Sequence, residues 1–370
     1  MNPELEILLI AVVTAVACAL VGVFLVLRRL ALVSDAIAHA ILPGIVVAFF
    51  LTGSLTSPLL VVAAAVTGVL SVALIEALHR TRLVAEDAAT GLVFPAFFSL
   101  GVIMVSRWAG NVHLDTDSVL LGELAFAPFD RWIVAGKDLG PSALWMMSGI
   151  LVLNLVLILV AAKELKLATL DPALATLLGF SPVLLHYLLM TAVSITAVGA
   201  FNAAGSILVV ALMIAPPAAA FLLVERVAPM IWLSAVLAVL GAIGGYGLAR
   251  WLDVSIAGSM AVMSGIIFAA SFLLAPERGL LSQARRRASQ KLEFSVRMLA
   301  VHLLHHEGTE REKEECGLDS LSRHLGWSDG VLRQAVGHTV HKALAFVESG
   351  VLHLTEEGRL FAEDLSVGVD

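Results

Sequence analysis

Nine long apolar runs occupy the first three quarters of this 370-residue sequence. A helix needs ~20 apolar residues to cross a bilayer, and the runs have about that length, at 5–27, 31–52, 58–78, 89–106, 143–162, 183–201, 203–223, 228–249 and 254–274. The sixth and seventh runs are separated only by a short polar break at 201–206. The 59% hydrophobic content excludes a single soluble enzyme. We therefore predict an all-α polytopic membrane domain of about nine spans, followed by a small α+β domain.

Charge divides the chain into unlike parts. Residues 283–370 hold 25 of the 53 charged side chains. We predict a transmembrane domain at 1–278, a basic juxtamembrane linker at 279–292 and a cytoplasmic winged-helix-like domain at 293–370. Three consecutive arginines in the linker, Arg285 to Arg287, are expected to contact lipid headgroups. The only cysteines are Cys18 and Cys316, which excludes a disulfide framework and a cysteine zinc site.

Lysine and arginine in the short loops predict the orientation, because they gather on the cytoplasmic side. One set of alternate loops carries seven of them, and the other set carries four (Arg107, Arg131, Lys137 and Arg250). This bias places the N-terminus outside and the tail in the cytoplasm of a multi-pass inner-membrane protein. In the long outer connection at 107–142, the semi-apolar stretch 118–129 predicts a surface or re-entrant helix.

The second run contains two ionisable residues, Asp35 and His39. Such groups are rare inside spans because each costs ~2.5–3.5 kcal/mol at the middle of a helix. Residues four apart share one helix face, so the pair forms half a site for a divalent cation such as Zn²⁺, Mn²⁺ or Fe²⁺. A structural Asp–His hydrogen bond between packed helices is an equal alternative. Pro43 and Gly44, which follow directly, predict a bend.

The segment from Arg29 to Gly44 closely resembles the signature of the zinc/manganese/iron permease family of ABC transporters. The resemblance covers about residues 5–278. It continues through Glu86 to Phe94, Asp115 to Gly122 and Gly205 to Ala220. The sequence departs from the family at Thr116, Leu121 and Ile256, where Leu, Phe and Pro are usual.

The resemblance implies import of a divalent metal (Mn, Zn or Fe) that an extracytoplasmic metal-binding protein delivers. Asp35 and His39 occupy the positions of the family's metal ligands. The implied partners are a second permease subunit, identical or a sister chain, and ABC ATPase subunits. This chain is expected to bind no cofactor and not to be an enzyme. Its only Gly-Lys pair, Gly136-Lys137, lacks the rest of a P-loop, so ATP hydrolysis is expected on a separate chain.

The segment 171–182 is similar to the coupling helix that docks into the ATPase of ABC importers. Asp171 is predicted to cap a short helix, Pro172 to start it, and Gly179 to end it after Leu178. An ordinary interfacial helix is the alternative. Asn202, His113 and Asp115 are candidate pathway residues, although helix capping for Asn202 and a solvated loop for His113 and Asp115 are the favoured explanations.

The tail has helix-turn-helix form at 318–336 and resembles the strand and wing of metal-dependent repressors at 348–362. It is nevertheless acidic, with 11 basic and 14 acidic residues, so DNA is not an expected partner. The tail also holds seven of the eleven histidines, so a metal site in the tail is a further alternative. The alternative function is a membrane-tethered, metal-responsive regulator that binds DNA. An intramembrane metalloprotease is excluded because no H-E-x-x-H motif is present.

Overall fold

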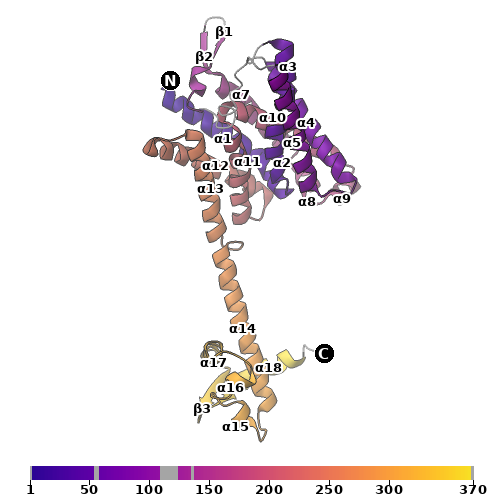
Figure 1. Cartoon of the computed structure of the whole chain (residues 1–370). Coiled ribbons are helices and arrows are strands. Elements are labelled where there is room, and N and C mark those ends of the chain that lie inside the picture. Colours follow the sequence, from indigo (N-terminus) through magenta and orange to yellow (C-terminus); the bar gives the residue numbers. More distant parts are fainter. Residues whose placement is uncertain (1, 54–57, 109–123, 135–136, 368–370) are drawn as a thin grey trace. The chain divides into compact units, whose positions relative to one another are not determined.

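The computed structural model describes residues 2–53, 58–108, 124–134 and 137–367 (Figure 1). The chain divides into two compact units, Met1–Gly279 and Leu280–Asp370. Helix α14 (Leu280–His306) opens the second unit and contains almost the whole segment that the sequence assigned to a linker. This segment is rich in Ala, Arg and Gln, which favour helix even where no apolar face is present.

The first unit is helical, and its helices confirm nine candidate spans among the described residues. The second span consists of two helices. The helices are α1 (Pro3–Leu27), α2 (Ala31–Ala40), α3 (Leu42–Thr52), α4 (Pro58–Arg80), α5 (Glu86–Trp108), α7 (Ser142–Val160), α10 (Pro182–Ala204), α11 (Ser206–Leu223), α12 (Val227–Leu252) and α13 (Ile256–Leu274).

Helix α1 lies at the centre of the packing in this unit. It contacts α7, α10, α11 and α12, and side chains such as Ile10 and Phe24 are almost completely buried. A Cβ atom at Gly22 would collide with the backbone carbonyl of Met213, so only glycine permits α1 to lie this close to α11. Small residues at helix contacts are typical of membrane bundles, in which close packing replaces the hydrophobic driving force.

A buried amide adds a polar connection to this packing. Asn154 of α7 donates one hydrogen bond to the Ala17 carbonyl of α1 at 3.2 Å and another to Thr196 Oγ1 of α10 at 2.8 Å. Interhelical hydrogen bonds of this kind contribute about 0.6 kcal/mol each in membrane proteins. Asn154 therefore joins three helices at one depth of the bundle.

The chain breaks where the sequence indicated. Helix α2 ends at Ala40, and α3 begins at Leu42 with Pro43 in its first turn, where the missing N–H costs nothing. A Cβ at Gly44 would collide with Thr67 of α4, so Gly44 allows α3 and α4 to pack closely. Gly205, with φ of 79°, is the single residue between α10 and α11, within the predicted break at 201–206.

The described part of the long connection at 107–142 differs from its prediction. It contains a short 3-10 helix, η1 (Ala127–Phe129), and an antiparallel hairpin of β1 (Arg131–Val134) and β2 (Lys137–Pro141). Of the helix predicted at 118–129, residues 118–123 lie outside the described residues. The rest forms a turn and η1, because Pro128 lacks the N–H that a continuing helix requires. Arg131 Nη1 lies 3.3 Å from Glu6 Oε2 and connects the hairpin to the start of α1.

The second unit has its own core, which includes Leu299, Leu303, Leu321, Leu332 and Leu352. After α14 its elements are α15 (Glu312–Glu315), α16 (Leu321–His324), α17 (Asp329–His341), β3 (Ala345–Glu348), β4 (Val351–Leu354) and α18 (Glu356–Val367). The two strands pair antiparallel, from Ala345 opposite Leu354 to Glu348 opposite Val351.

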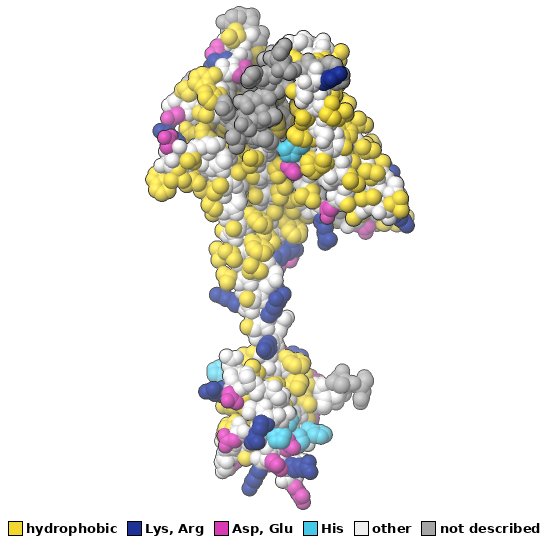
Figure 2. Space-filling model, in the orientation of Figure 1, with side chains coloured by type: hydrophobic (Ala, Val, Ile, Leu, Met, Phe, Trp, Pro, Cys, Tyr) yellow, Lys and Arg dark blue, Asp and Glu magenta, His cyan; other side chains and the backbone are white. Residues whose placement is uncertain are grey.

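Helix α17 ends at His341, and Ala343 has φ of 56°, a left-handed conformation that stops a helix before the strand begins. Ser349 and Gly350 also have positive φ, as the two-residue turn of a tight hairpin requires. Figure 2 shows apolar side chains over the membrane unit with charged groups mainly at its ends, and mixed charges over the C-terminal unit.

We expect Gly22→Ala to lower the melting temperature of the detergent-solubilised protein, because overpacking of this kind costs about 1–3 kcal/mol. Gly247→Ala is the matched control, since a Cβ at Gly247 of α12 meets no atom within 4 Å. Alanine is the better helix former by up to ~1 kcal/mol, so the control should melt at or above the wild-type temperature. Equal melting temperatures for the two variants would contradict the close approach of α1 and α11.

Candidate functional site

Asp35 and His39 lie together on one face of α2. The distance from His39 Nε2 to Asp35 Oδ1 is 3.5 Å, as the four-residue spacing predicts. Val33 and Ile37, on the opposite face, are buried in the core of the unit. The ionisable pair instead lies on the open face, where the Asp35 side chain is 46% exposed and that of His39 is 24% exposed. Helix α2 therefore turns its polar face outward and its apolar face inward, the reverse of what a lipid-facing helix needs.

Aromatic rings of α5 hold the imidazole in place. The ring of His39 lies 5.9 Å from that of Phe98, almost perpendicular to it, and 6.1 Å from that of Phe94. Edge-to-face contacts at this distance are favourable and restrict ring rotation. Helix α5 thus covers one side of His39, while the side shared with Asp35 stays accessible.

The pair offers one nitrogen and one oxygen donor. Its separation of 3.5 Å exceeds the usual length of a hydrogen bond between such groups, so neither group is tied strongly to the other. Imidazole and carboxylate together suit Zn²⁺ or Mn²⁺, which take four or more ligands. A cation at this site would need further donors from water or from another chain.

The other candidate pathway residues are Asn202, His113 and Asp115. His113 and Asp115 lie outside the described residues. Asn202 lies in the last turn of α10, two residues before it ends at Ala204. The pathway roles of these residues stay predictions.

The predicted short helix at 171–182 has each expected element. Helix α8 (Ala162–Leu170) leads to α9 (Pro172–Leu177), and Asp171 Oδ1 accepts a hydrogen bond from the Leu174 N–H at 2.9 Å. Gly179 has φ of 85° and ends the helix, with the Phe180 N–H donating to the Ala175 carbonyl at 3.0 Å.

The apolar side chains at the end of α9 are open. Leu177 is 83% exposed and Leu178 is 61% exposed, whereas Ala175 is completely buried. Helix α9 therefore presents leucines outward from a firmly capped turn. Exposed apolar groups on a rigid element are typical of a protein contact.

The contacts of Arg28 beside α9 were not predicted. Arg28, just after α1, donates from Nε to Thr169 Oγ1 of α8 at 3.1 Å, and its Nη1 lies 3.3 Å from His186 Nδ1 of α10. These residues line a cleft of about 460 Å³ beside α9. Burial lowers the pKa of Arg28, although the guanidinium stays charged at any physiological pH. The sequence indicated only that Arg28 follows a span, because its partners lie 141 and 158 residues away.

The architecture defines a class of protein. A bundle of nine candidate spans among the described residues, with an ionisable pair in one span and a capped helix exposed at one end, is that of a polytopic transport subunit. The chain belongs to the ABC 3 transport family, whose model matches residues 5–275. This membership supports the permease prediction over the tethered regulator.

Two bacterial membrane proteins are similar in sequence to most of this chain. It is 47% identical over 366 residues to the zinc transport system membrane protein TroD of Treponema pallidum, covering 98% of this chain and all of that protein. It is 45% identical over 293 residues to the manganese transport system membrane protein MntD of Bacillus subtilis, covering 79% of this chain and 99% of that protein. Because the first match spans nearly the whole chain, it includes the C-terminal unit.

A solved structure has a similar fold. It is PsaBC from Streptococcus pneumoniae in complex with Fab, with a TM-score of 0.64 and 26% identity, covering 77% of this chain and 96% of that one. The helical bundle described above is therefore the permease fold of this family.

Proposed function

We propose that this chain is the membrane subunit through which an ABC importer moves Zn²⁺ or Mn²⁺ into the cell, with Asp35 and His39 as ligands along the path. One observation carries the proposal: a carboxylate and an imidazole lie 3.5 Å apart inside an apolar span of a chain in this family. Relatives named for zinc and for manganese are 47% and 45% identical, which favours these two metals. None of the relatives described above is named for iron, the third metal that the sequence suggested.

The two donors of the pair suit transient binding of a transported cation better than permanent binding. A transport site must bind its ion strongly enough to admit it and weakly enough to release it. Two protein donors leave at least two positions of a divalent cation to water or to other groups. The open side of the pair gives the ion a way in and out.

The exposure of Asp35 argues for a second permease subunit. A carboxylate that faced lipid would cost about 2.5–3.5 kcal/mol, and the Asp35 side chain is 46% exposed on this chain alone. A second permease chain, identical or a sister, would cover this face and bring its own donors to the cation. The path would then lie between the two subunits.

ATP hydrolysis is assigned to a separate ABC ATPase, because this chain lacks a P-loop. Helix α9 is the proposed coupling helix, with Leu177 and Leu178 inserted into an apolar cleft of the ATPase. Arg28 connects α8 to α1 and α10 directly behind it, so a movement of α9 reaches the start of the span that carries Asp35. An extracytoplasmic metal-binding protein would deliver the ion to the opposite face.

The proposed orientation places the N-terminus outside and the C-terminal unit in the cytoplasm, on the basis of the Lys and Arg bias in the loops. The same arrangement puts α9 on the cytoplasmic side, where the ATPase works. Arg285 to Arg287, in the first turns of α14, would meet the headgroups of the inner membrane.

The C-terminal unit is proposed to be a winged helix that makes protein contacts. Helices α16 and α17 followed by the β3–β4 hairpin support this assignment, since they have the order of a helix-turn-helix and a wing. DNA binding depends on Lys and Arg that neutralise phosphates. Arg333 is the only such residue within α17, and acidic residues outnumber basic ones in the tail, so DNA remains an unexpected partner.

We expect Asp35→Ala and His39→Ala to reduce ATP-driven uptake of radioactive Zn²⁺ or Mn²⁺ at least about 10-fold in proteoliposomes that contain the ATPase. Mutation of a residue that only hydrogen-bonds to a metal ligand already lowers metal affinity or activity by that factor. His79→Ala is the control, because this histidine is exposed at the end of α4. Wild-type uptake by both site variants, at equal protein level, would place the path elsewhere.

We expect Leu178→Glu to uncouple ATP hydrolysis from transport, because a buried carboxylate would oppose docking of α9. Leu178→Met keeps an apolar side chain of similar volume and should stay coupled. The measurement is the ratio of ions imported to ATP hydrolysed. An unchanged ratio for Leu178→Glu would remove α9 as the coupling contact.

A further inference from the structure

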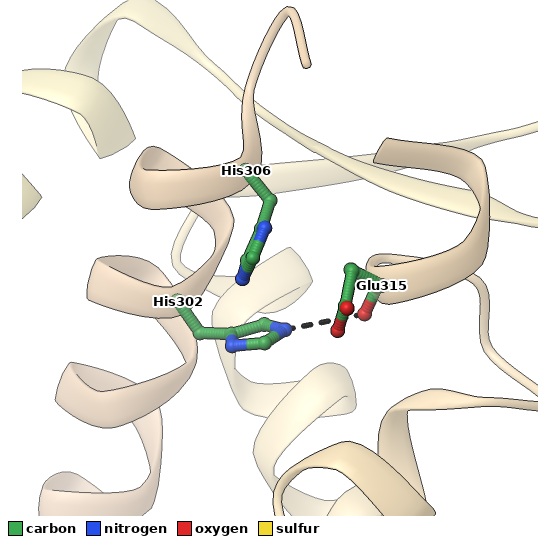
Figure 3. Close-up of side chains that lie close together, drawn as sticks. All are labelled: His302, His306 and Glu315. Carbon is green, nitrogen blue, oxygen red and sulfur yellow. Dashed lines mark hydrogen bonds between the residues drawn. The ribbon is translucent and has the colours of Figure 1, made fainter. Parts of the chain in front are cut away.

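Two histidines and a glutamate converge in the C-terminal unit (Figure 3). His302 and His306 come from the last turns of α14, and Glu315 ends the short helix α15. One ligand atom from each residue lies within 4.8 Å of the others. Elsewhere in the described part of the chain, no set of three His, Cys, Asp or Glu side chains comes this close.

The backbone places these groups in a defined way. His302 and His306 are four residues apart on one helix, so they share a face, and their ring centroids are 4.7 Å apart. The chain then turns and returns through α15, which brings Glu315 opposite them. His302 Nε2 lies 3.2 Å from the Glu315 carbonyl oxygen, and this contact holds the ring toward α15.

The charges around the cluster favour a cation. A neutral imidazole always keeps one lone pair, so two imidazoles and a carboxylate offer three donor groups, with one ligand atom of each within 4.8 Å of the others. Other acidic groups nearby have their own partners: Glu307 pairs with Arg359, and Glu312 Oε1 lies 3.1 Å from His353 Nδ1. Glu315 Oε2 lies 2.9 Å from His324 Nδ1 of α16, a contact that would orient the carboxylate from behind.

We propose that His302, His306 and Glu315 form a binding site for a first-row divalent cation, with Zn²⁺ bound more tightly than Mn²⁺. Two imidazoles and one carboxylate, with water in the remaining position, are a ligand set that Zn²⁺ commonly takes. Zn²⁺ also exceeds Mn²⁺ in affinity for sites of this kind. The bound ion would join the end of α14 to α15.

This site is separate from Asp35 and His39, which lie in the other unit. The proposal of this site therefore does not depend on the proposed transport path. If the chain carries Zn²⁺ or Mn²⁺ as proposed, the same class of ion that passes through one unit would bind to the other.

The test uses the full-length protein in lipid nanodiscs, with Asp35→Ala and His39→Ala introduced so that the membrane pair contributes no signal. Co²⁺ is the probe, because its visible absorption bands report four or five ligands, and Zn²⁺ should abolish the bands by competition. We expect one Co²⁺ per chain, and His306→Ala should weaken binding at least about 10-fold. His305→Ala is the matched control, because this neighbouring histidine is not among the three ligands.

Glu315→Gln keeps the size of the side chain and one acceptor oxygen for the contact with His324, and it therefore controls for a loss of folding. It should retain the melting temperature but lose the Co²⁺ bands. Three results would each overturn the proposal: no saturable binding, equal loss in His305→Ala and His306→Ala, or wild-type binding by Glu315→Gln. In the last case the carboxylate would not be a ligand.

Discussion

The cost of an ionisable group in an apolar span is the constraint on which the rest of this molecule depends. Asp35 and His39 lie in a segment that is otherwise hydrophobic, on the face of α2 that its own unit leaves open. Such a pair is tolerated where it meets water, a cation or another protein chain. Phe94 and Phe98 confine His39 from one side. On the other side, this requirement accounts for the proposed second subunit.

Helix α1 connects several distant parts of the bundle through polar contacts. Its start is connected to the β1–β2 hairpin through Glu6 and Arg131, its middle accepts a hydrogen bond from Asn154, and its end is followed by Arg28. Arg28 contacts the helix that precedes α9 and stands three residues before α2 begins. The half-buried Arg28 thus connects the helix before α9 to the start of the span that carries the ionisable pair.

The sequence predicts the elements whose causes are local. Bilayer thickness dictates the length of an apolar run, so the nine spans agree within a few residues, and Asp171, Pro172 and Gly179 mark the ends of α9 by their own backbone chemistry. Contacts between separate segments were not predictable, as with Arg28 and His186 or with His302 and Glu315 across a turn. Pro128 disfavours the helix predicted at 118–129, and the composition of the predicted linker at 279–292 favours the helical form that it takes in α14.

The central claim is that the transported ion contacts His39 directly. Pulsed electron paramagnetic resonance of Mn²⁺ bound to the assembled permease and ATPase measures this contact, because an imidazole nitrogen ligand modulates the electron spin echo. The complex should carry His306→Ala and Glu315→Gln, so that the proposed site in the C-terminal unit binds no Mn²⁺. The extracytoplasmic binding protein should be left out. We expect nitrogen modulation that disappears with His39→Gln and persists with the control His79→Ala. Unchanged modulation in the His39→Gln complex would contradict the account.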